Sequence, residues 1–128
     1  MLKNILLVAL GGAAGSVARY LLSKAVQGAA ASSFPWGTMA VNVAGCLLIG
    51  LFYGLSGDGG ARIGQDLKLM LTVGFCGGFT TFSTFANESL TLAKTGDALL
   101  SAVYMGSSVA LGMLAVVAGA QLAKAFAS

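Results

Sequence analysis

The chain of 128 residues has no histidine, only two cysteines and few charged side chains. Without histidine it lacks the commonest metal ligand and the commonest acid–base catalyst. The number and spacing of Cys46 and Cys76 suggest neither a zinc site nor a disulfide framework, so we interpret both as small packing residues. The glycine-rich run from Gly11 to Gly15 follows no strand and is therefore no nucleotide-binding loop. Nothing in these residues supports an enzyme.

Charge is scarce over the whole chain. Only 9% of the residues are charged and 57% are hydrophobic, whereas an average soluble domain is about 25% charged. The composition therefore predicts an integral membrane protein in a lipid bilayer. The net charge of +3 comes from scattered residues, and no basic patch or aromatic array suited to nucleic acid is present.

Four apolar segments predict an all-α membrane protein with one domain of four transmembrane helices covering residues 1–128. We expect the spans at about 4–26, 36–56, 67–93 and 98–124, each near the roughly 20 residues that a spanning helix needs. The first segment could also be read as a signal peptide, because Lys3 precedes its apolar run. Its apolar character continues past Arg19 to Leu22, which favours a span.

The basic residues barely distinguish the two membrane faces. With four crossings, the N-terminus, the second loop and the C-terminus share one side. That side holds Lys3, Arg62, Lys68 and Lys124, and the other holds Lys24 and Lys94, plus Arg19 if it reaches the interface. Such a weak bias allows insertion in both orientations. Four crossings surround a pore poorly, so we expect an antiparallel, dual-topology homodimer with its two-fold axis in the membrane plane.

Small residues four apart predict close helix contacts, which we interpret as the role of most of the 19 glycines. The pairs are Gly11 with Gly15, Ala14 with Ala18, Gly106 with Ala110, and Gly112 with Val116.

The third span is interrupted by glycines, hydroxyls and aromatic rings between Gly74 and Phe85. A broken helix at membrane depth is tolerated only against protein or a water-filled path. On a helix, Phe82 and Phe85 share one face, whereas Thr80 and Thr84 share another. Electropositive ring edges and hydroxyl donors could replace the hydration shell of a very small anion. Alternatively, the rings are core residues and the hydroxyls bond back to their own helix.

Three motifs in this order resemble the Fluc (CrcB) family of fluoride channels. They are Gly77 to Phe85 in the third span, Gly11 to Tyr20 in the first and Gly37 to Gly45 in the second. The resemblance implies a passive fluoride channel in the bacterial inner membrane, built as a dual-topology homodimer with two antiparallel pathways. Fluoride would leave the cell down the membrane potential.

The resemblance also implies site residues. Phe82 and Phe85 would supply the rings and Asn42 an amide donor. The accompanying polar track would comprise Thr81, Ser83, Thr84, Tyr104 and Ser108, with Ser107 competing for the place of Ser108. Arg19 would lie at an aqueous vestibule or reach the headgroups, and Glu88 would lie at the pathway's edge or at the membrane interface.

A structural sodium ion is the cofactor that the resemblance implies. It would bind the backbone carbonyls of Gly77 and Thr80 from both subunits, a plausible oxygen cage for a hard cation. Because Gly77 and Gly78 permit a non-helical backbone, we expect the third span to break between Gly77 and Thr80.

Two other classes of membrane protein fit four short spans. A small multidrug transporter depends on a glutamate in its first helix, and this first helix has no acidic residue. A non-conducting assembly subunit would need only the glycine contacts, which leaves the polar and aromatic cluster of the third span unexplained. Fluoride flux would separate the three classes.

Overall fold

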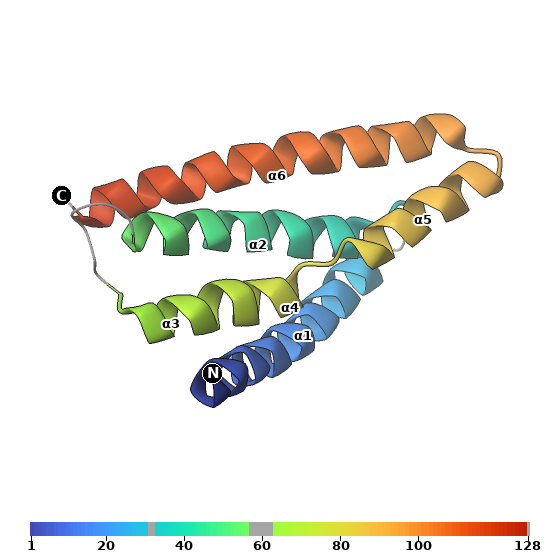
Figure 1. The fold of residues 1–128 in the computed structure, drawn as a ribbon. Coiled ribbons are helices and arrows are strands. Elements are labelled where there is room, and N and C mark those ends of the chain that lie inside the picture. Colours follow the sequence, from blue (N-terminus) through green and yellow to red (C-terminus); the bar gives the residue numbers. More distant parts are fainter. Residues whose placement is uncertain (31–32, 57–62, 128) are drawn as a thin grey trace.

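The computed structural model describes residues 1–30, 33–56 and 63–127, and within this part of the chain the fold is entirely helical (Figure 1). The expected Arg62 on the second loop lies outside the described residues. The elements in chain order are α1 (Leu2–Ala30), α2 (Trp36–Leu55), α3 (Gln65–Leu69), the π-helix η1 (Met70–Cys76), α4 (Gly77–Phe79), α5 (Ser83–Lys94) and α6 (Ala98–Ala127).

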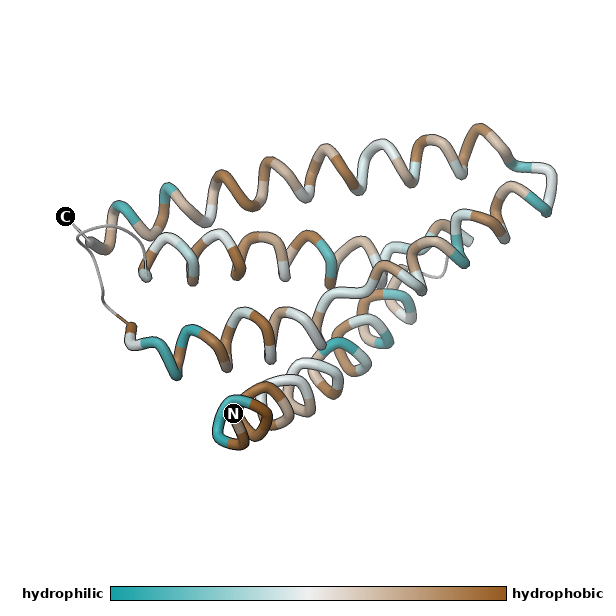
Figure 2. The backbone as a smooth tube through the Cα atoms, viewed as in Figure 1, coloured by the Kyte–Doolittle hydropathy of each residue, from teal (hydrophilic) through white to brown (hydrophobic). Residues whose placement is uncertain are grey.

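Four spans are long and apolar enough to cross a membrane, which confirms the predicted fold class of a multi-pass membrane protein. They are Leu2–Ala30, Trp36–Leu55, Gln65–Lys94 and Ala98–Phe126. In Figure 2, brown hydrophobic residues recur along these helices. The first span continues to Ala30, four residues beyond the expected end, so Gln27 belongs to α1 and not to a loop.

Helices α2 and α6 lie side by side along their length (Figure 1). A Cβ atom on Gly50 would collide with the backbone oxygen of Val116, and one on Gly119 with that of Leu47. Only glycine lets the two backbones approach this closely. A Cβ on Gly106, by contrast, would meet no described atom within 4 Å, so that glycine serves no helix contact in this protomer.

The contact of α1 with the third span confirms the packing role predicted for Gly11 and Gly15. A Cβ on Gly11 would collide with the carbonyl oxygen of Met70, and one on Gly15 with that of Phe75. The third span faces them with η1, whose π-helical winding the sequence pattern did not predict. Single-turn π-helical insertions occur often at functional sites.

The third span is broken, as expected, but the break covers Thr80–Phe82 and so begins only at the last residue of the expected segment. Helix α4 ends at Phe79, Thr80 is extended with φ −84° and ψ 159°, and α5 begins at Ser83. The expectation that the glycine pair forms the break is wrong, because Gly77 is helical (φ −62°, ψ −38°) and Gly78 lies inside α4. A Cβ on Gly78 would stand 2.6 Å from the carbonyl oxygen of Gly12, so this glycine permits close packing on α1.

Candidate functional site

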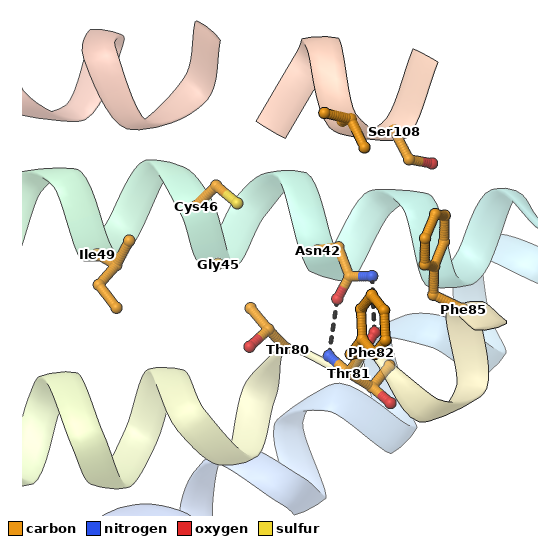
Figure 3. A pocket seen from close by; sticks show the side chains of 10 residues that line it. Asn42, Gly45, Cys46, Ile49, Thr80, Thr81, Phe82, Phe85 and Ser108 are labelled. Carbon is orange, nitrogen blue, oxygen red and sulfur yellow. Dashed lines mark hydrogen bonds between the residues drawn. The ribbon is translucent and has the colours of Figure 1, made fainter. Parts of the chain in front are cut away.

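The amide side chain of Asn42 on α2 holds the backbone of Thr81 inside the break. Asn42 Oδ1 accepts a hydrogen bond of 2.8 Å from the Thr81 N–H, and Asn42 Nδ2 donates one of 3.0 Å to the Thr81 carbonyl oxygen (Figure 3). One side chain therefore satisfies both backbone groups of a residue that no helix pairs. This matters in a bilayer, where an unpaired backbone group finds no water.

Two further hydrogen bonds complete the ends of the interrupted helix. Arg19 Nε donates to the Gly78 carbonyl oxygen at 3.0 Å, and the Thr84 N–H donates to Thr81 Oγ1 at 3.3 Å. The first pairs a carbonyl at the end of α4, and the second pairs an amide in the first turn of α5. Both are positions that a helix end leaves without an internal partner.

The break also redirects two amides away from carbonyls that they would meet in a continuous helix. There, the N–H of Thr81 would bond to Gly77 O, and that of Thr84 to Thr80 O. Both amides bond elsewhere, to Asn42 Oδ1 and to Thr81 Oγ1. The carbonyl oxygens of Gly77 and Thr80 have therefore lost these helical donors, which leaves them suited to a hard cation that takes oxygen ligands.

A cavity of about 340 Å³ opens beside the break (Figure 3). It is lined by Asn42, Gly45, Cys46, Ile49, Thr80, Thr81, Phe82, Phe85, Ser108 and Val109. Five of the predicted pathway residues thus meet on one wall, although they come from α2, the third span and α6. The rings of Phe82 and Phe85 lie 6.0 Å apart between centroids at an interplanar angle of 48°.

Ser108, and not Ser107, faces this cavity. The Ser108 hydroxyl oxygen is buried and has no hydrogen-bond partner among the described residues. Ser107 instead donates to the Val103 carbonyl oxygen of its own helix at 2.6 Å. The Ser108 hydroxyl thus lacks a partner among the described residues, whereas the Ser107 hydroxyl is already satisfied.

A second cavity of about 560 Å³ carries the positive charge of the site. It is lined by Arg19, Tyr20, Ser23, Lys24, Gln27, Gly28, Thr38, Val41, Thr81 and Thr84. Thr81 lines both cavities, so both border the break. The structure thereby places Arg19 and Thr84 together, as well as Lys24, which the sequence reasoning did not select.

Ser83 and Tyr104 line neither cavity. Ser83 is exposed, with its oxygen 3.5 Å from Thr81 Oγ1. Tyr104 is fully buried: its ring lies 5.1 Å from that of Phe85, and its hydroxyl donates to Glu88 Oε1 at 3.1 Å. Glu88 lines a third cavity of about 210 Å³. Tyr104 thus packs against the Phe85 ring. No local sequence pattern indicates this contact.

The alternative in which hydroxyls bond back to their own helix holds for part of the third span. Thr80 Oγ1 donates to the Cys76 carbonyl oxygen at 2.9 Å, and Ser89 Oγ to that of Phe85 at 2.8 Å. Cys46, which we expected only to fill space, lies on the cavity wall. Its position four residues after Asn42 puts both on one face of α2, a signal that the sequence did contain.

Known proteins similar to the chain give its family. The family model described as CrcB-like protein, Camphor Resistance (CrcB), matches residues 6–120. A protein of Phocaeicola vulgatus named fluoride-specific ion channel FluC is 52% identical over 118 residues, which cover 92% of this chain and 96% of that protein. A protein of the same name from Bacteroides fragilis is 49% identical over 128 residues, with 98% and 99% covered. One from Rhizobium johnstonii is 45% identical, with 95% and 97% covered. A family match over most of the chain and relatives aligned over nearly their full length show that the chain belongs to the CrcB family.

Proposed function

We propose that this membrane protein is a passive channel that lets fluoride leave the bacterial cytoplasm. One observation carries the proposal: two phenylalanine rings beside the break share a cavity with the Ser108 hydroxyl of α6, which has no hydrogen-bond partner in the described part of the chain. The names of the relatives, fluoride-specific ion channel, agree with this chemistry. No catalytic group is needed, because a passive channel only lowers the barrier to ion movement.

The second cavity would act as the entrance. Arg19 and Lys24 give it two positive side chains, which raise the local concentration of anions. Because Thr81 lines both cavities, an anion drawn in by these charges arrives at the break. Ser23 and Thr84 supply hydroxyls on the same wall, which can donate hydrogen bonds to an anion.

The first cavity would replace the water around fluoride. Ser108 offers a hydroxyl donor, and the amide nitrogen of Asn42 carries two hydrogens, of which Thr81 takes one. Phe82 and Phe85 can turn positive ring edges toward an anion. Donors held in fixed positions would compensate the dehydration of a small anion better than that of a larger one. Ser83 and Tyr104 remain in the proposal as neighbours of Thr81 and Phe85, respectively.

A second copy of the chain would complete the pathway. Phe82 is 78% exposed in the protomer although it borders the first cavity. A partner subunit related by a two-fold axis in the membrane plane would cover this ring and close the cavity from the open side. The proposed assembly is thus an antiparallel homodimer with one pathway on each side of the axis.

The same dimer would hold a structural sodium ion. Gly77 and Thr80 each offer a carbonyl oxygen that has lost its helical donor, so two subunits supply four such oxygens. A bound cation would balance the dipoles of these carbonyls and join the two third spans.

Flux measurements test the function directly. Purified protein in liposomes loaded with potassium fluoride, with sodium present on both sides, should release fluoride, detected with a fluoride electrode, once valinomycin relieves the charge imbalance. Liposomes loaded with chloride should release little, because the site compensates only the dehydration of the smaller ion. Empty liposomes give the background leak. Comparable rates for the two anions would contradict the proposal.

The dual topology has its own test. A single cysteine placed at Ser128 of a chain with Cys46→Ala and Cys76→Ala should react with a membrane-impermeant maleimide in about half of the molecules, because insertion is balanced. Adding several lysines between the first two spans should fix one orientation, so that either nearly all or nearly none of the molecules are labelled. Uniform labelling of the unmodified chain would show a single orientation and rule out the antiparallel dimer.

A further inference from the structure

We propose that Asn42 is the positioning residue that sets the shape of the break, and that this role is separate from any contact with the permeating ion. The inference rests on the proposed function only for its effect on flux. The role of Asn42 in holding the break does not depend on which ion the protein conducts. Two hydrogen bonds carry it, one accepted from the Thr81 N–H and one donated to the Thr81 carbonyl, at 2.8 and 3.0 Å.

The chemistry of this contact requires an amide. A carboxylate can accept from the N–H of Thr81 but cannot donate to its carbonyl oxygen, and an apolar side chain can do neither. Asparagine offers an acceptor and a donor at the end of one short side chain, so it replaces the pairing that a neighbouring backbone would give. The two bonds fix Thr81 against α2 from a position 39 residues earlier in the chain.

The position of Thr81 determines the position of its neighbours in the pathway. Phe82 follows it directly, and the Oγ1 atom of Thr81 accepts from the Thr84 N–H in the first turn of α5. Thr81 also lines both cavities. A Thr81 that moves away from α2 would therefore shift the ring of Phe82 and the start of α5 together.

The other end of the break is fixed independently, which limits the proposed role to one segment. Arg19 on α1 donates to the Gly78 carbonyl oxygen, and Gly78 packs against Gly12. Loss of the Asn42 contacts should therefore loosen residues 80–84 and leave the end of α4 in place. A purely structural core residue would instead loosen the whole helix bundle.

Amide hydrogen exchange of the full-length protein in liposomes tests this assignment, with flux measured on the same preparations. In Asn42→Leu, which keeps the side-chain size, we expect the Thr81 amide to exchange at least about tenfold faster, while amides of the α2–α6 contact stay protected. Asn42→Asp keeps the acceptor and should restore the protection of the Thr81 amide without restoring the donor to its carbonyl. Both variants should lose fluoride flux.

Ser108→Ala is the matched control, because it removes a hydroxyl from the same cavity without touching the break. It should lower the flux and leave the exchange at Thr81 unchanged. Unchanged exchange at Thr81 in Asn42→Leu would overturn the positioning role, and so would equal loss of protection throughout the bundle. If Thr81 loosens in Asn42→Leu but the unsubstituted protein carries no fluoride, the positioning role stands and the proposed function fails.

Discussion

Fluoride efflux from liposomes is expected to fall at least about tenfold when Phe82 or Phe85 is replaced by isoleucine, with the protein still assembled. Isoleucine keeps apolar bulk but has no electropositive ring edge to offer an anion. A barrier raised by about 1.4 kcal/mol reduces the rate tenfold, which is within the range of one lost contact of this kind. The measurement is the initial rate of fluoride release per reconstituted protein.

The two substitutions should differ in their effect on stability. Phe82 is 78% exposed in the protomer, so its replacement removes little packing within the chain. Phe85 lies 5.1 Å from the Tyr104 ring and packs against the buried cluster of Phe34, Met39, Leu92 and Tyr104. Its replacement is expected to cost about 1–3 kcal/mol of packing. Size-exclusion chromatography in detergent would show whether either variant loses its assembly.

Phe75→Ile is the matched control for these variants. Phe75 lies in the same span and stacks on Phe79 at 5.6 Å between centroids, but it lines neither cavity at the break. Its replacement should leave fluoride efflux within about twofold of the original, since it removes no contact with the ion. Normal efflux in both Phe82→Ile and Phe85→Ile would make the rings core residues and refute their place in the pathway.

Removal of sodium is expected to abolish most of the fluoride efflux. The N–H groups of Thr81 and Thr84 bond elsewhere, so they no longer pair with the carbonyls of Gly77 and Thr80. Without a cation, nothing would take the place of these two donors. In the proposed dimer interface no water would replace these donors, and a carbonyl left unpaired there would cost about 1–3 kcal/mol, so the break should rearrange. The experiment replaces sodium by a large organic cation on both membrane faces and compares efflux before and after prolonged exchange, which a buried ion requires.

Two controls make the sodium result specific. Restoring sodium should restore the efflux, and potassium added at the same ionic strength should not, if the oxygen cage fits the smaller ion. Efflux that stays constant through complete exchange of sodium would refute the cation site. It would leave the fluoride assignment untouched, because that assignment is argued from the residues that line the first cavity and not from a bound cation.

The sequence predicted the number of spans and the residues with functional chemistry for a physical reason. Hydropathy and span length are properties of consecutive residues, so four apolar segments suffice to predict four helices. The clustering of Phe82 and Phe85 with hydroxyl residues in the third span is equally local. Motifs in three spans then predicted the family that the comparisons confirm.

Only the tertiary structure decided how those residues are used. The break lies at Thr80–Phe82 and not at the glycine pair, because Asn42 supplies its pairing from 39 residues away and Arg19 from 59. Gly78 proves to be a packing residue because α1 leaves no room for a Cβ atom at this position. Likewise, Ser107 and Ser108 are adjacent in sequence, but the Ser107 hydroxyl is satisfied and that of Ser108 meets no partner within residues 1–30, 33–56 and 63–127. Such choices depend on which distant backbone or side chain stands opposite each polar group, and local pattern carries no information about that.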